Sequence, residues 1–381
     1  MRTKKRKQTS FGLLILSLCI IWFVSLFNGT GLGENYQTNK YARILVVIIF
    51  FAILLNKYRM CKTLSADYSW LFCFGSMFLV FLVSSYVKGY GGVALEYLWC
   101  LLLVYVVSRI KVSDRALRII GIVFLILGAA ILYIFSYRSE LRGWNGNSIA
   151  MVSFLSYIVF YISIFKARKL MTRVFASLLT VAYVLMLEYT NSRSCIFSMI
   201  IILLLLLFSN EVSRILKYRQ IYLIMLLVPL IIAVIVLTLS KTGYIAVFDN
   251  WSYSVFSKPF TNGRNILWSR AYDTFFVSPF FGTGQLTYTQ WHNSAISCLV
   301  TYGVFGYVLW IACQYLILTI GIPYIEDSIV SGCIISYFVI SVQQATELGI
   351  ISTNPNPLFY LPLSLMIGRI RFIKSNLTQK E

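Results

Sequence analysis

The sequence predicts an all-α, polytopic membrane protein, and three observations support this fold class. Hydrophobic residues make up 59% of the 381 residues, whereas soluble domains are only about 45–50% apolar. The mean hydropathy of +0.79 is too high for a water-soluble core. The 33 Lys and Arg residues outnumber the 13 Asp and Glu residues, and they gather in gaps between apolar runs. We therefore expect a single integral membrane domain over residues 1–381.

Apolar runs long enough to cross a bilayer follow one another along the chain. A helix needs about 17–25 mostly apolar residues to span the hydrocarbon core. We predict twelve spans, of which the second and eighth are short. They are Phe11–Phe27, Ala42–Leu55, Tyr68–Val87, Gly92–Val107, Leu117–Phe135, Ile149–Phe165, Val174–Tyr189, Cys195–Phe208, Ile221–Leu239, Ser294–Ile320, Ile329–Ala345 and Pro357–Ile370.

The distribution of basic residues predicts the orientation, because Lys and Arg near span ends stay cytoplasmic. The basic start, Met1–Ser10, places the N-terminus inside. It precedes an apolar run without a small-x-small cleavage site, so we interpret Phe11–Phe27 as an uncleaved span. Twelve spans then place the C-terminus inside as well. Basic residues outside or at the outer boundary are Lys40, Arg43, Lys88, Arg138, Arg142, Arg193, Lys241, Lys258, Arg264 and Arg270.

The composition argues against two classes of function. A net charge of +20 can indicate nucleic-acid binding, but most of these cations lie beside spans, where anionic lipid headgroups account for them. The expected environment is membrane lipid, with no nucleic-acid partner. The eight cysteines have no metal or redox spacing and His292 is the only histidine, so we expect no metal and no cofactor.

One long segment, residues 240–293, interrupts the rhythm of spans and short loops on the outer side. Loops of more than about 12–15 residues are usually functional or disordered, and its many aromatic residues argue against disorder. We predict a folded extracytoplasmic loop with short amphipathic helices. One helix should begin after Asn262-Gly263 and end at Ser278-Pro279, with Trp268, Ala271, Tyr272 and Phe275 at helical spacing.

Two arginines on the outer side each allow two interpretations. Arg264, at the start of that helix, either anchors an amphipathic helix at the interface by snorkelling or points into an outward-facing cavity. Arg193 lies at the edge of an apolar hairpin. It either snorkels, paired with nearby Glu188, or forms an anion site, since charged residues near spans normally face a protein interior or a water-filled cavity.

The same side offers further candidates. Arg138 and Arg142 add two cations, partly offset by Glu140. A lone histidine such as His292 is often a structural residue or helix cap, yet it is also the side chain here that can accept a proton near neutral pH. Several arginines, one potential base and many aromatic residues suit a substrate with a diphosphate, sugars and a lipid tail, because guanidinium groups grip phosphate oxygens.

These features resemble the bacterial O-antigen ligase and polymerase superfamily of membrane glycosyltransferases. The resemblance covers about the C-terminal half of the chain. It rests on Asn191-Ser192-Arg193-Ser194, on Gly263-Arg264-Asn265-Ile266-Leu267-Trp268 followed by Pro279-Phe280-Phe281-Gly282-Thr283-Gly284, and on His292-Asn293-Ser294 followed by Gly303 and Gly306.

The resemblance implies a GT-C-like membrane glycosyltransferase fold in the bacterial cytoplasmic (inner) membrane. It implies an undecaprenyl-diphosphate-linked oligosaccharide donor and acceptor, used without metal or nucleotide sugar. Arg193 and Arg264 would bind the diphosphate leaving group, and His292 would orient or deprotonate the acceptor hydroxyl. We add Arg138, Arg142, Arg270 and Asn293 as candidate substrate-binding residues.

The sequence therefore predicts a repeat-unit polymerase for a capsule, exopolysaccharide or O-antigen, with chain-length regulators and flippases as candidate partners. Two alternatives stay open. A ligase would transfer the glycan to a lipid or surface acceptor. A flippase for the same lipid-linked glycans would also have about twelve spans, but it needs charges near the bilayer midplane, within its spans.

Overall fold

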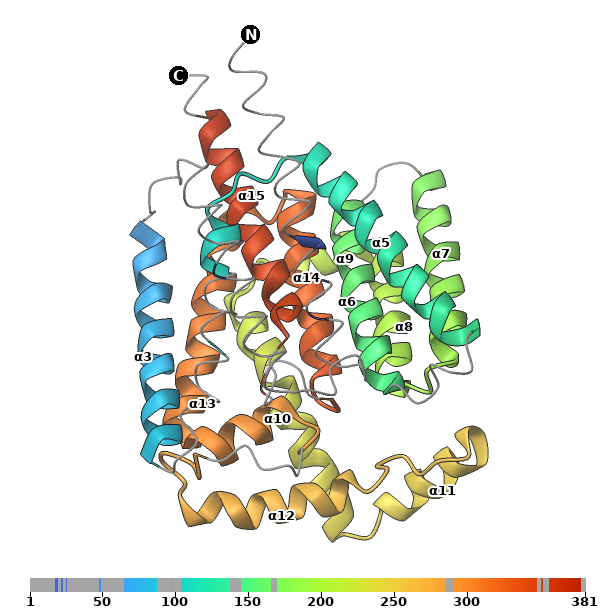
Figure 1. Cartoon of the computed structure of the whole chain (residues 1–381), viewed down its shortest axis with the longest axis vertical. Coiled ribbons are helices and arrows are strands. Elements are labelled where there is room, and N and C mark those ends of the chain that lie inside the picture. Colours follow the sequence, from blue (N-terminus) through green and yellow to red (C-terminus); the bar gives the residue numbers. More distant parts are fainter. Residues whose placement is uncertain are drawn as a thin grey trace.

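The computed structural model describes residues 18, 19, 22, 25, 48, 65–87, 97, 104–137, 145–165, 170–284, 291–347, 351 and 356–377. All regular secondary structure in these residues is helical. The helices, shown in Figure 1, are α3 (Ser65–Val87), α5 (Asp114–Tyr137), α6 (Gly146–Ile164), α7 (Leu170–Glu188), α8 (Arg193–Leu207), α9 (Ser209–Ile215), α10 (Arg219–Lys241), α11 (Ile245–Phe256), α12 (Arg264–Val277), α13 (Ser294–Ile320), η3 (Ile322–Tyr324), α14 (Ser328–Gln343), η4 (Pro357–Tyr360) and α15 (Leu361–Leu377).

Several of these helices are long and apolar enough to cross a membrane. Within the described ranges there are six: α3, α5, α6, α7, α10 and α13 continued through η3. Helices α8 and α9 meet at an angle of 92° and make a seventh if this bent pair is one span. Helix α14 is apolar but shorter. These findings confirm that the described part of the chain is all-helical and has several potential membrane spans.

The total of twelve spans is not confirmed. Most residues of the predicted spans Phe11–Phe27, Ala42–Leu55 and Gly92–Val107 lie outside the described residues. The last predicted span, Pro357–Ile370, is the short helix η4 followed by α15, which is not among the six candidate spans. Helix α15 carries two buried arginines, Arg369 and Arg371, whose charges separate it from an ordinary lipid-facing span.

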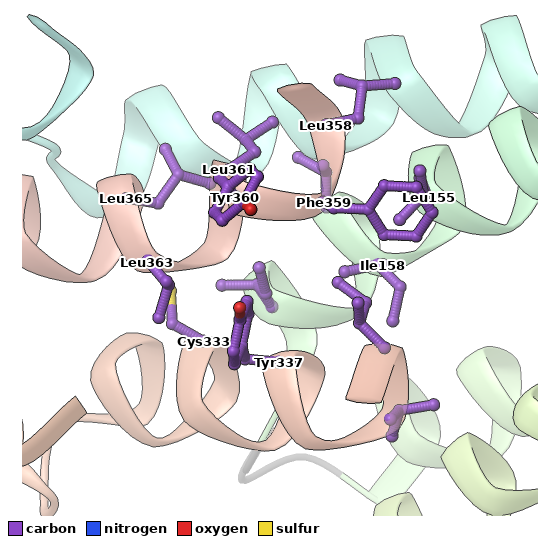
Figure 2. Close-up of a cluster of buried hydrophobic side chains, with 14 of the residues drawn as sticks. Leu155, Ile158, Cys333, Tyr337, Leu358, Phe359, Tyr360, Leu361, Leu363 and Leu365 are labelled. Atoms are coloured by element: carbon purple, nitrogen blue, oxygen red, sulfur yellow. The ribbon is translucent and has the colours of Figure 1, made fainter. Parts of the chain in front are cut away.

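Helices α6, α14 and α15 form the centre of the bundle. Helix α6 packs against α5 and α14, and α14 packs against α15. Figure 2 shows side chains from all three, among them Leu155 of α6, Tyr337 of α14 and Leu365 of α15, filling one buried space. Helices α6 and α14 carry no charged residue, and helices that are apolar on every face belong in the interior of a large or membrane-embedded bundle. Helix α15 lies beside them with Arg369 and Arg371 paired to carboxylates.

Ion pairs made by two buried arginines fix one end of the bundle. The guanidinium of Arg369 lies 2.9 Å from Asp114 at the start of α5 and 2.7 Å from Asp327, the N-cap of α14. Arg371 pairs with Asp67 in the first turn of α3. Carboxylates are favoured at helix N-termini because the helix dipole is positive there. The two arginines of α15 therefore tie the starts of three helices together.

Helix α13 has the predicted bounds but is broken at Gly303, whose φ of 67° and ψ of −171° are not helical. Residues 279–284 pair with the break: Val304 N–H donates to the Pro279 carbonyl over 2.8 Å, and Gly284 N–H donates to the Thr301 carbonyl over 2.9 Å. This pairing satisfies backbone groups that a break would leave without partners at membrane depth. Figure 1 shows α13 turning at its lower end, so residues 294–302 form a separate half-helix.

We predict that Gly303→Ala destabilises the protein by about 1–3 kcal/mol, because this backbone conformation is essentially restricted to glycine. A Cβ at this position would also lie 2.2 Å from the Phe280 carbonyl oxygen. The measurement is thermal unfolding in detergent. Gly75→Ala in α3 is the matched control, since nothing lies within 4 Å of its Cβ position. Equal melting temperatures for the two variants would contradict the prediction.

Candidate functional site

The carboxylate of Glu347, just beyond α14, joins three groups from distant parts of the chain. Its Oε1 lies 2.8 Å from Nη2 of Arg264 and accepts a hydrogen bond from Ser194 Oγ over 3.4 Å. Its Oε2 lies 3.5 Å from Nδ1 of His292. Glu347 and Arg264 are only 12% and 17% exposed. The candidate residues Arg264 and His292 therefore share one largely buried counter-ion.

The groups around Glu347 come from the starts of three helices. Arg264 is the first residue of α12, Ser194 is the second of α8, and His292 directly precedes Asn293, the N-cap of α13. Helix N-termini carry a partial positive charge and unpaired N–H groups. Three such ends and two arginines gather positive charge at this junction, and Glu347 and Asp249 offset part of it. The N–H groups at the helix starts can bind an anion.

Arg193, the first residue of α8, faces the segment 240–293. Its Nη1 and Nη2 each donate to the Pro259 carbonyl over 3.1 Å, and Nη1 also donates to Ser252 Oγ over 3.3 Å. It lies close enough to Arg264 and Asp249 to feel their charges. The guanidinium of Arg193 therefore lies among polar groups of residues 249–264.

The turn before Arg264 is held by Asp249 of α11. The backbone N–H of Thr261 donates to Asp249 Oδ1 over 2.9 Å. Gly263 has a φ of 79°, in the left-handed region, and directly precedes Arg264. Helix α12 has the predicted start and end, and its Trp268 and Ala271 are buried against residues of α10 and α13. Arg264 therefore points into the protein, and α12 is not simply an interfacial helix.

His292 is held in an unusual backbone conformation. Its φ of 47° lies in the left-handed region, which costs a non-glycine residue about 1–3 kcal/mol unless its surroundings enforce it. The residues on both sides are anchored. Trp268 Nε1–H donates to the Trp291 carbonyl over 2.6 Å, and Asn293 is bonded on three sides. The backbone of His292, which carries the imidazole, is therefore fixed on both sides.

The two ring nitrogens of His292 differ in environment. Nδ1 is buried without a hydrogen-bond partner, although the side chain as a whole is 35% exposed. Nε2 belongs to this partly exposed side chain and is not itself one of the buried atoms without a partner. The N-cap of α13 is Asn293, so His292 is not the cap. This leaves the imidazole free for an acid–base role.

The other candidate residues have different positions. Asn293 is fully buried; its amide donates to the carbonyls of Pro229 and Ala345, and its oxygen caps α13, so its role here is structural. Arg270 is on α12 but exposed, outside the group at Glu347. Arg138 and Arg142 lie outside the described residues. No cluster of three or more His, Cys, Asp or Glu side chains that could hold a metal occurs within the described ranges.

Our sequence reasoning missed Glu347, although a signal was present. Glu347 is the only charged residue between Asp327 and Arg369. A single ionisable residue in a long apolar stretch is by default a candidate for function. In comparisons with known proteins, the chain matches no family model, and no curated protein or solved structure is significantly similar to it.

We predict that Asn293→Ala lowers the free energy of unfolding by about 2–3 kcal/mol, from a lost N-cap and two lost buried hydrogen bonds to carbonyls. Thermal unfolding in detergent measures this loss. Asn250→Ala, at an exposed position on α11, is the control and should melt like the wild type. An Asn293→Ala protein as stable as the control would show that the three hydrogen bonds contribute little.

Proposed function

We propose that the chain is a membrane glycosyltransferase that polymerises undecaprenyl-diphosphate-linked oligosaccharide repeat units. The observation that supports this best is the meeting of Arg264, Arg193 and a solvent-accessible imidazole at three helix N-termini. Such a junction can hold a diphosphate and, beside it, a base. The proposal also uses the resemblance of these same motifs to the O-antigen ligase and polymerase superfamily.

In the proposed reaction, a sugar hydroxyl of the acceptor attacks the anomeric carbon of the donor glycan. The bond from that carbon to the diphosphate breaks, and its electron pair stays on the departing lipid diphosphate. The hydroxyl proton passes to Nε2 of His292. Preorganised cations act where negative charge develops, and this is usually the largest single contribution to catalysis. Arg193 and Arg264 would supply that charge.

The arginines keep donors for a ligand. Glu347 takes one N–H of Arg264, and a guanidinium has five. The remaining donors of Arg264 can bind phosphate oxygens in the forked geometry that guanidinium groups favour. The nearby helices α11 and α12 expose Trp251, Tyr253 and Tyr272, whose ring faces can stack on sugars. A donor with a diphosphate and a glycan therefore has matching groups within one region.

Two other functions would use the same lipid-linked glycan. A ligase shares the donor chemistry and differs in its acceptor, so the acceptor supplied in an assay separates ligase from polymerase. A flippase binds near the bilayer midplane and carries charges within its spans. Here the charged groups lie at helix starts, beside the segment that holds α11 and α12. This placement favours the enzyme.

We predict that Arg193→Ala and Arg264→Ala each reduce polymer formation by about 100-fold or more, because each removes a cation from the leaving group. Purified protein in detergent, supplied with lipid-linked repeat unit, should form a ladder of longer glycans, whereas a flippase would have no compartment to cross. His292→Ala should cost about 100- to 10,000-fold.

Lys258→Ala is the matched control for that assay. Lys258 is exposed in the same outer segment, and its loss should leave the ladder unchanged. Full activity of Arg264→Ala would count against the diphosphate site. Full activity of His292→Ala would remove the proposed base while leaving the anion site in place.

The proposal also requires the site to face outward, with both termini cytoplasmic. Ser269 on α12 and Tyr218 are exposed and flank opposite ends of α10. We predict that a membrane-impermeant maleimide labels Ser269→Cys in intact spheroplasts and labels Tyr218→Cys only after permeabilisation. Wild-type protein reports the background from native cysteines. The reverse pattern would place the site on the cytoplasmic side, away from its proposed substrate.

A further inference from the structure

Glu347 contacts its partners with different oxygens. Oε1 lies against Arg264 and Ser194, whereas Oε2 faces Nδ1 of His292. The first two contacts fix the rotation of the carboxylate, so the direction of Oε2 is set by groups other than the histidine. The imidazole of His292 therefore faces an acceptor oxygen whose position Arg264 and Ser194 determine.

The burial of Nδ1 limits what the ring can do. An ionised carboxylate is only an acceptor, so a ring nitrogen directed at it is favoured in its protonated form. Nδ1 is buried, lies 3.5 Å from Oε2 and lacks a hydrogen bond of good geometry. Catalytic hydrogen bonds are often long in the unliganded state and shorten with substrate. A small ring rotation would complete this bond and leave Nε2 as the free base.

We propose that Glu347 is a positioning residue for His292: it selects the tautomer with the proton on Nδ1 and stabilises the positive ring formed when Nε2 accepts a proton. That this proton comes from the acceptor hydroxyl rests on the proposed function. The tautomer and the pairing of charges do not rest on it. The proton leaves the ring for solvent after the product departs, so the step balances without another reactant.

The charges around the imidazole of His292 show how Glu347 would act on a positively charged ring. Arg264 from α12 shares the Glu347 carboxylate with the ring, and Arg193 from α8 lies close to Arg264. Asp249 from α11 acts on Arg193, and the Cys195 thiol of α8 lies near Glu347. Glu347 is the carboxylate in contact with the ring. Without its charge, a positive imidazole would stand among arginines.

The single histidine of the chain makes a direct test possible. Protein labelled with ¹⁵N-histidine and purified through a tag without histidine gives the imidazole signals of one residue. In the wild type we expect the neutral ring to carry its proton on Nδ1. In Glu347→Gln we expect a larger share of the neutral ring to carry its proton on Nε2, because the ionised acceptor that faces Nδ1 is lost. Asp273→Asn, which removes an exposed carboxylate of α12, should keep the wild-type tautomer.

A wild-type ring that carries its proton mainly on Nε2 would overturn the proposal, and this holds even if Glu347→Gln cannot be recovered from the membrane. An unchanged proportion of the two tautomers in Glu347→Gln would overturn it as well. The ladder assay is scored separately. If the NMR spectra show the expected tautomer but the protein makes no polymer, the glycosyltransferase is refuted and the Glu347–His292 pairing stands. If the protein makes polymer but the ring carries its proton on Nε2, the pairing is refuted and the glycosyltransferase stands.

In active protein, the rate per folded molecule should fall about 10- to 100-fold in Glu347→Gln. Glu347→Asp, which keeps the charge, should recover part of the rate. A purely structural role predicts a smaller yield of folded protein with the wild-type tautomer and the wild-type rate per folded molecule, and that result would count against the proposal.

Discussion

The attraction between one carboxylate and its positively charged surroundings makes the central junction possible. The starts of α8, α12 and α13 carry partial positive charge, and Arg193 and Arg264 add two full charges. Without an anion these groups would repel one another in surroundings where water screens poorly. Glu347 supplies the anion from beyond the end of α14. The packing of four elements at this point therefore depends on it.

The irregular backbone near the junction has hydrogen-bond partners from other segments, and these hold its polar groups in place. The break at Gly303 is filled by residues 279–284, and the resulting half-helix begins at the cap Asn293. Asn293 in turn bonds the carbonyls of Pro229 in α10 and Ala345 after α14. His292 is thus fixed relative to α10 and to the segment that carries Glu347. Groups held this way need little reorganisation when charge develops.

Features governed by local chemistry could be predicted from the sequence. The apolar runs predicted α5, α6 and α10 closely, and Asn262-Gly263 and Ser278-Pro279 predicted the bounds of α12. Arg193, Arg264 and His292 stood out because ionisable groups are rare near spans. The contact of Glu347 with two of them joins residues 83 and 55 positions apart, and the structural role of Asn293 depends on carbonyls from other helices. Such pairings depend on tertiary packing, which single-sequence patterns do not contain.

The length of α14 bears on how deep in the bilayer the junction around Glu347 lies. Its 16 residues rise only about 24 Å, which is less than the roughly 30 Å of bilayer hydrocarbon. One end is tied by Asp327 to Arg369, and Glu347 follows closely after the other. If the Asp327 end sits at headgroup level, the Glu347 end stops short of the opposite headgroups. A lipid carrier could then deliver its polar head by lateral diffusion within the leaflet, without rising out of the membrane.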